Sequence, residues 1–202
     1  SISCSCKDPH LYLAHGGHTD FRGKHNTIYN LLSSQNVSIN VKAENSIFML
    51  KGNRIHGSFF TELYARFRDE ENREVLVDVN ASKANANGWG WSMVHMKCGA
   101  SRPRGVYPHT TMTCTKDKNY MPNVHVDLST TFIQVKEWNI KVTVKPIYER
   151  RQGPKHRIDV AFESLKSDDA FAASPHGLIG CSFDGDDTPR YGKTDVYPEP
   201  YS

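Results

Sequence analysis

Three aspartates near the C-terminal end of the sequence have the side chains and the spacing that a metal ion requires. Asp184, Asp186 and Asp187 stand around Gly185 in the segment SFDGDD. Hard cations such as calcium bind several oxygen ligands at short range, and a loop that contains glycine can bring neighbouring carboxylates to one point. We therefore expect a structural calcium site in this loop. A solvated acidic turn is the alternative.

A second group with metal-binding chemistry lies near the N-terminus. His15 and His18 flank a Gly-Gly pair, and Asp20 and His25 follow closely. Imidazole and carboxylate ligands bind zinc, copper or another transition metal, and a metal-bound water beside a cation such as Arg22 could hydrolyse phosphodiesters. The alternative function is therefore a metal-dependent hydrolase, such as a nuclease-type toxin acting on nucleic acid, with His15, His18, His25 and Asp20 as its catalytic group. In the competing interpretation, these histidines occupy turns and bond to backbone groups.

Two tryptophans are flanked by glycines in the segment NGWGW, at positions 89 and 91. Tryptophan presents a large flat face together with one N–H donor. If Trp89 and Trp91 are exposed, they form a platform for a sugar or another flat ligand, which gives a carbohydrate-binding protein as a further alternative. If they lie on a strand, both rings share one face and pack in the core.

Five cysteines, at positions 4, 6, 98, 114 and 181, limit the disulfides that the chain can form. Cys98 and Cys114 bracket a loop rich in Gly, Pro and Arg, so a bridge between them would constrain that loop. This leaves Cys181 for Cys4 or Cys6, with one cysteine over. We carry the pair Cys6 and Cys181 forward as the expected second bridge.

The cysteines and two glycosylation sequons favour an extracellular setting. The sequons begin at Asn36 and Asn80 and fit a secreted glycoprotein. The chain begins at Ser1 without a leader, which we interpret as a mature product whose signal has been removed. No apolar run approaches the length that crosses a bilayer, so we expect a soluble protein without a membrane span. Reduced thiols in a cytosolic protein are the alternative.

The composition fits one globular domain. The 202 residues are 38% hydrophobic and 23% charged, which is enough to build a core and argues against disorder. The formal net charge of +3 permits binding to phosphates or acidic surfaces without requiring it. We expect a single domain over residues 1–187, followed by an extended tail over residues 188–202.

Alternation of apolar and polar residues predicts the strands that must position these side chains. In residues 36–42 (NVSINVK), Val37, Ile39 and Val41 share one face. No helix of ordinary length is expected, and turn signals recur at regular spacing. We therefore predict an all-β fold, a β-sandwich of about ten antiparallel strands. The expected strands are residues 27–32, 36–42, 46–51, 55–68 (long or bulged), 73–80, 89–96, 124–128, 130–136, 138–144 and 158–162.

The two ends of the chain resemble a known family. Asp8-Pro9-His10 shortly after Cys6, and Asp20-Phe21-Arg22-Gly23 about ten residues further on, are similar to the opening of a von Willebrand factor type D domain. Residues 177–186 (GLIGCSFDGD) are similar to the Gly-Leu-Cys-Gly-Asn-Phe-Asp-Gly motif that closes that domain. The similarity does not extend over residues 50–173. It implies a β-sandwich in a secreted setting.

The resemblance also implies that calcium binds at Asp184, Asp186 and Asp187, with Asp20 as a partner from the opening segment. The leading prediction is thus a secreted, disulfide-stapled module that binds an extracellular protein or glycan or has a structural role, and that is not an enzyme. In this prediction the two ends of the domain are neighbours, joined by a disulfide and by calcium.

Overall fold

The computed structural model of the chain describes residues 2–6, 10–14, 16–69, 71–114, 122–165 and 175–180, with the backbone alone for residues 2–6. These residues form fifteen strands and one 3-10 turn, η1 (Ala81–Lys83). The strands pair antiparallel in two sheets, and the side chains between the sheets form a common core. Within the described ranges, no helix has the length and hydropathy needed to span a membrane. The predicted all-β sandwich is confirmed.

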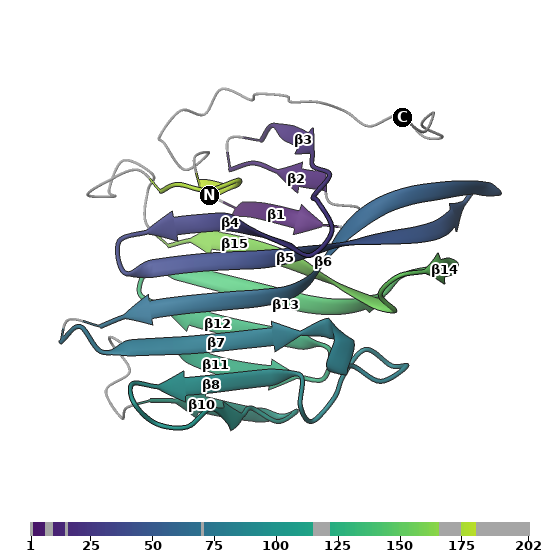
Figure 1. Cartoon of the computed structure of the whole chain (residues 1–202). Helices are drawn as coiled ribbons and strands as arrows, with labels where there is room; N and C mark the ends of the chain where they lie inside the picture. Colours follow the sequence, from purple (N-terminus) through teal and green to yellow (C-terminus); the bar gives the residue numbers. More distant parts are fainter. Residues whose placement is uncertain are drawn as a thin grey trace.

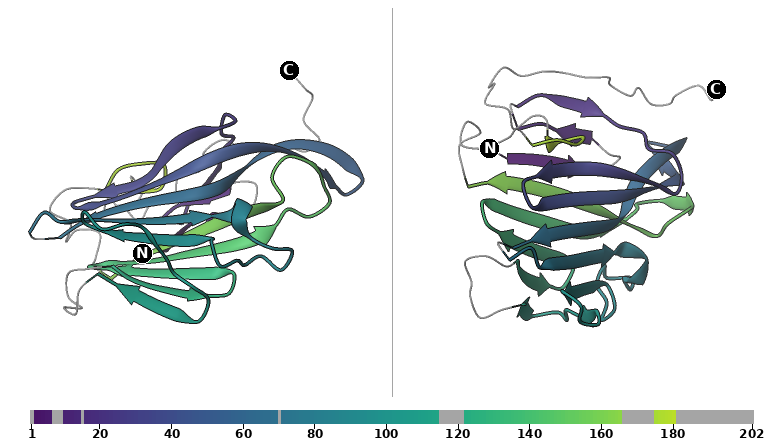
Figure 2. Two further views of the ribbon diagram at one scale, coloured as in Figure 1. Left: turned by 60° about the horizontal axis from the view of Figure 1, so that its bottom comes forward. Right: turned by 60° about the vertical axis from the view of Figure 1, so that its left-hand side comes forward.

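One sheet has eight strands and the other has seven, and the two views of Figure 2 show them as stacked layers. The eight-stranded sheet runs in the order β10 (Thr110–Thr113), β11 (Asn123–Asp127), β12 (Thr130–Val135), β13 (Trp138–Pro146), β15 (His156–Ser164), β1 (Ile2–Cys6), β2 (His10–Tyr12) and β3 (His18–Asp20). The seven-stranded sheet runs in the order β14 (Arg150–Gln152), β5 (Val37–Leu50), β6 (Asn53–Arg68), β7 (Glu74–Asn80), β8 (Val94–Cys98) and β9 (Arg104–Gly105), with β4 (Thr27–Ser34) also on β5 (Figure 1).

The core lies between the sheets because long strands such as β5 and β13 bury alternate side chains. Along β5, for example, Val37, Ile39, Val41 and Ala43 are all buried. Burying an aliphatic or aromatic side chain of this size stabilises the fold by about 1.5–3 kcal/mol before entropy is counted. The bulkiest fully buried side chains are Trp138, Phe60, Phe67 and Phe162.

The long hairpin of β5 and β6 extends past the sandwich beside β14 (Figure 1). A second, smaller apolar cluster holds this end, formed by Phe48, Ile55, Phe59 and Ile147. The pairing of β5 with β6 shifts register between Lys42 and Ala43, which identifies β6 as the long, bulged strand that its sequence predicts.

The strand count differs from the expected ten for two reasons. Residues 36–42 and 46–51 belong to one continuous strand, β5, rather than to two. The additional strands β1, β2, β3, β9, β10 and β14 have two to five residues each, which is too short for alternation to reveal. The extended segment predicted over residues 89–96 is wrong in its first half, because β8 begins only at Val94.

The two ends of the described chain lie together. β1 pairs antiparallel with β15, from Ile2 opposite Glu163 to Ser5 opposite Val160. Residues 175–180 lie along β4, where Ser33 and His176 exchange two backbone hydrogen bonds of 2.7 Å. Figures 1 and 2 both show this segment, in yellow-green, beside the N-terminal strands.

Gly177 is required for this docking. Its φ of +100° is a conformation that L side chains rarely adopt, and a Cβ there would lie 2.8 Å from the carbonyl oxygen of Leu31. The docked segment also delivers Ile179 to the core, where its side chain is fully buried.

Candidate functional site

Three aromatic side chains form an exposed cluster between β7 and β10, which we call the aromatic platform: Trp89, Trp91 and Tyr107. The ring centroids of the two tryptophans are 6.1 Å apart, and those of Trp91 and Tyr107 are 5.6 Å apart. Trp91 is 64% exposed and Tyr107 is 48% exposed, while Trp89 is half-buried. The alternative that both tryptophans pack in the core from one strand is therefore wrong, because they lie in the loop before β8.

The tryptophan loop is fixed by its own backbone and by asparagine side chains. The backbone N–H of Asn85 donates to the carbonyl of Trp89 at 2.8 Å, and the Asn85 side-chain oxygen accepts from the N–H of Asn87 at 2.8 Å. Gly90 lies so close to the carbonyl oxygen of Lys83 that a Cβ would collide with it. Asparagine favours turns through such local hydrogen bonds, so the sequence positions the indoles before a ligand arrives.

Tyr107 belongs to the loop that the Cys98–Cys114 disulfide closes. The Cα atoms of the two cysteines are 5.5 Å apart, and the residues are 16 positions apart in the sequence. The predicted bridge between them is therefore confirmed. Cys98 ends β8 in one sheet and Cys114 follows β10 in the other, so the bond joins the two sheets. Closing a loop of this length stabilises a fold by about 3 kcal/mol in the chain-entropy account.

A row of polar side chains leads away from the platform across the outer face of the seven-stranded sheet. Tyr64 stands opposite Asp78, Asp78 opposite His95, and His95 opposite Gly105. Residues opposite each other in antiparallel strands share a face of the sheet. The ring of Tyr107 covers Gly105, where a Cβ would lie 3.1 Å from the ring, so the row meets the platform at this point.

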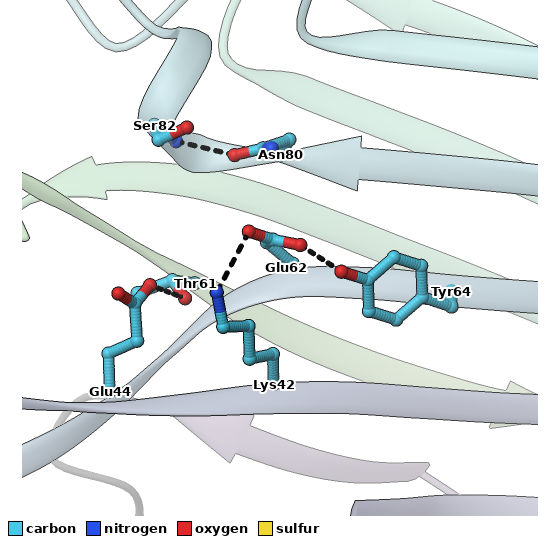
Figure 3. A network of polar contacts seen from close by, with 7 residues as sticks. All are labelled: Lys42, Glu44, Thr61, Glu62, Tyr64, Asn80 and Ser82. Carbon is cyan, nitrogen blue, oxygen red and sulfur yellow. Dashed lines mark hydrogen bonds and ion pairs between the residues drawn. The ribbon is translucent and has the colours of Figure 1, made fainter. Parts of the chain in front are cut away.

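Beside this row, Glu62 is the centre of a network of polar contacts (Figure 3). Its carboxylate accepts from the Tyr64 hydroxyl and lies 3.4 Å from Lys42 Nζ. Burial raises the pKa of Tyr64 far above the usual range of a phenol, and both the hydrogen bond to Glu62 and the negative charge of Glu62 add to this effect. The phenol therefore stays protonated as a donor. Desolvation raises the pKa of Asp78, an effect that His95 opposes and Glu62 reinforces.

The N-terminal group of predicted metal ligands is partly described, and its members have other contacts. Asp20 Oδ1 meets His10 Nδ1, and the Nδ1 atom of His25 accepts from the backbone N–H of Asn45 at 3.1 Å. His18 lies on β3, paired with β2. In the part of the chain that the structure describes, no three His, Cys, Asp or Glu side chains are close enough to hold a metal ion.

Several predicted sites lie outside the described residues and stay predictions. They are His15, the calcium ligands Asp184, Asp186 and Asp187, the cysteine Cys181, and the tail over residues 188–202. For Cys6 the structure gives the backbone, which pairs with His10 in β2. The Cys6–Cys181 bridge thus stays a prediction.

The two predicted glycosylation sites differ in their surroundings. Asn36 is exposed in the turn between β4 and β5, with a positive φ of 64°. Asn80 is half-buried at the end of β7, where its side-chain oxygen accepts from the N–H of Ser82 at 2.9 Å and caps η1 (Figure 3). Asn36 therefore offers the freer access to a modifying enzyme.

Sequence reasoning found the tryptophans and missed their partners. Tyr107 stands alone in a loop, and its proximity to Trp91 depends on the path of that loop. Asp78 and His95 occupy polar positions in strands where apolar and polar residues alternate, and this alternation is visible in the sequence. Their position next to the platform depends on how the strands pair. Neither a protein-family model nor a curated protein sequence matches the chain. The resemblance to type D domains therefore stays a prediction.

Proposed function

We propose that the protein is an extracellular carbohydrate-binding module whose aromatic platform stacks against sugar rings. The observation that carries this proposal is the exposed contact of Trp91 with Tyr107, backed by Trp89. A pyranose ring presents C–H groups on its faces, and these fit the electron-rich face of an aromatic ring. Hydroxyl groups at the rim of the sugar then require the kind of polar side chains that line the adjoining sheet.

Two further observations support a binding role at this position. The local hydrogen bonds of Asn85 and the Cys98–Cys114 bond hold both loops of the platform, so little ordering is needed when a ligand binds. A disulfide is also most stable in an oxidising compartment, which agrees with the proposed extracellular setting.

Calcium at Asp184, Asp186 and Asp187 belongs to the proposal as a structural brace. The docking of residues 175–180 along β4 supports it, because this segment leads into the acidic loop from a position beside the N-terminal strands. Elemental analysis of the purified protein tests it. The proposal predicts bound calcium that is lost on treatment with a chelator, and a protein free of calcium would contradict this part.

Screening on a glycan array, followed by titration calorimetry with the best ligand, tests the proposed function. Trp91→Ala should weaken binding at least about tenfold, since loss of a stacked aromatic costs on the order of 1.4 kcal/mol or more. Tyr148→Ala is the matched control, because Tyr148 is 78% exposed and follows β13, outside the platform. Unchanged affinity in Trp91→Ala, or equal losses in both variants, would contradict the proposal.

A further inference from the structure

We infer that the ligand site continues from the aromatic platform across the outer face of the seven-stranded sheet and takes a neutral glycan chain rather than a single sugar. The inference rests on the proposed carbohydrate binding and specifies its substrate class. The additional binding residues that it assigns are Asp78 and His95.

The path of the site follows from strand pairing. Tyr107 lies over Gly105 in β9, and from there the row passes to His95 in β8, Asp78 in β7 and Tyr64 in β6. Neighbouring strands lie about 4.8 Å apart, so the row spans about 14 Å perpendicular to the strands. A ligand that contacts both the platform and the row must therefore be longer than one sugar ring.

Gly105 makes the platform and the row continuous. A Cβ at this position would lie 3.1 Å from the Tyr107 ring, so a side chain here would push the ring away from the strand. The backbone of Gly105 has an ordinary negative φ, since it is not among the positive-φ glycines, and the close approach is the reason for glycine here. The aromatic surface thus ends directly beside His95.

The side chains of the row divide into occupied and available groups. Tyr64 and Lys42 both bind Glu62, so the polar groups of these three residues are already engaged. Asp78 and His95 interact with each other electrostatically, and no hydrogen bond in the described part of the chain engages either side chain. A carboxylate and an imidazole can each bind a sugar hydroxyl, the carboxylate as acceptor and the imidazole in either role.

The charge of the row favours a neutral glycan. Within the row, Glu62 and Asp78 both carry carboxyl groups, and the cation of Lys42 is paired with Glu62. The cations of the next row along the same strands are Arg66, which pairs with Glu74, and Lys97. Carboxylates that face the ligand directly repel a sulfated or uronic acid chain at this point. The hydroxyl groups of a neutral chain instead gain acceptors along the row.

Titration calorimetry of the full chain with neutral oligosaccharides tests the inference. The probes are β-linked glucose and N-acetylglucosamine series, each from the monosaccharide to the hexasaccharide, with oligogalacturonate as the acidic series. For a neutral series that binds, wild-type affinity should rise with length. The double variant Asp78→Ala/His95→Ala should lose about tenfold in affinity for the hexasaccharide and little for the disaccharide. Asp127→Ala, an exposed carboxylate on the outer face of the other sheet, is the control and should bind like wild type.

The outcomes separate the inference from the proposed function. Unchanged hexasaccharide affinity in the double variant overturns the extended site, while a loss in Trp91→Ala would still support the platform. If oligogalacturonate binds more tightly than any neutral oligomer, the assignment of a neutral glycan as the ligand is overturned. If wild-type protein binds no neutral oligomer, the inference falls together with neutral glycan binding at the platform. Thermal unfolding of each variant verifies that it is folded.

Discussion

The outer faces of the two sheets carry similar side chains in different arrangements. On the eight-stranded sheet, Thr111, His125, Phe132 and Lys141 stand opposite one another in β10 to β13. Thr111 Oγ1 lies 2.8 Å from His125 Nδ1, the His125 ring stacks on Phe132, and Lys141 Nζ lies 5.9 Å from the Phe132 ring centroid. Each member of this row thus contacts its neighbour.

The row on the seven-stranded sheet ends differently. The aromatic side chains next to it, Trp91 before β8 and Tyr107 after β9, contact each other and leave large surfaces exposed. Cross-strand contacts that are complete within a row stabilise the sheet. A row that ends in an exposed aromatic pair has instead surface left for a ligand. The comparison predicts a stabilising role for one face and a binding role for the other.

The largest expected effect concerns the Cys98–Cys114 disulfide, which joins the two sheets. Replacing Cys98 and Cys114 together by serine should lower the free energy of unfolding by about 3 kcal/mol, because the unfolded chain regains the entropy of a loop of this length. Urea denaturation measures the change, and wild-type protein under reducing conditions is the control. If the variant and wild type have the same free energy of unfolding, the bridge does not stabilise the joint between the sheets.

A smaller effect is expected where the chain ends meet. Gly177→Ala should destabilise the fold by roughly 2 kcal/mol, because the methyl group meets the Leu31 backbone and the positive φ becomes strained. Gly16→Ala is the matched control: its φ is +86°, but a Cβ there would have no neighbour within 4 Å. Thermal or urea unfolding distinguishes the two. Equal destabilisation would show that the close approach to β4 contributes nothing beyond backbone strain.

The roles of the two faces can be separated with one aromatic substitution on each. Trp91→Ala should reduce glycan affinity at least about tenfold and leave the free energy of unfolding nearly unchanged. Phe132→Ala should lower the free energy of unfolding by about 0.5–1 kcal/mol through the loss of its contacts with His125 and Lys141, and leave affinity unchanged. Calorimetry gives the glycan affinity of each variant, and urea denaturation gives its free energy of unfolding. A loss of affinity in Phe132→Ala alone would reverse the assignment.

The smallest effects are in the pH dependence of stability. His156 in the eight-stranded sheet and Asp78 in the seven-stranded sheet change the free energy of unfolding with pH in opposite directions. Burial, reinforced by Lys155, lowers the pKa of His156, so its contribution to stability is present above the ordinary pKa of 6.5 and is lost as the pH falls below it. The raised pKa of Asp78 gives a contribution to stability that is fully present below pH 3.8, the ordinary pKa of the group. This contribution is lost as the pH rises through the raised pKa of the folded state. Urea denaturation across pH should show a flatter acid limb in His156→Leu. In Asp78→Asn, the loss of stability on rising pH above 3.8 should disappear, and an unaltered profile in either variant contradicts the corresponding shift.

Alternation along the chain was sufficient to predict the layered β fold. The strict pattern of residues 36–42 places Val37, Ile39 and Val41 in the core, and the structure buries all three. The aromatic, β-branched segment of residues 55–68 became the long bulged strand that was expected. Alternation failed where local turn contacts override it, as in the tryptophan loop. There GWGW has the spacing of a strand, but backbone hydrogen bonds from Asn85 to Trp89 and from Gly88 to Asn85 close a turn.

The candidate site was only half visible in the sequence, for a physical reason. Trp89, Trp91 and the Cys98–Cys114 bridge follow from local composition and spacing. The row of Tyr64, Asp78 and His95 depends on lateral register, which is set by core packing across β6, β7 and β8. In the same way, the pairing of Asp20 with His10 follows from the short hairpin of β2 and β3.

The most direct test of the two-face account is a nuclear magnetic resonance titration of the isotope-labelled full chain with the neutral oligosaccharide that binds most tightly. The account predicts that the indole N–H of Trp91 and the amides of Tyr107, His95 and Asp78 shift together with one dissociation constant. The amides of His125, Phe132 and Lys141 on the opposite face should stay in place. Shifts confined to the opposite face, or an unperturbed Trp91 indole at saturation, would contradict it.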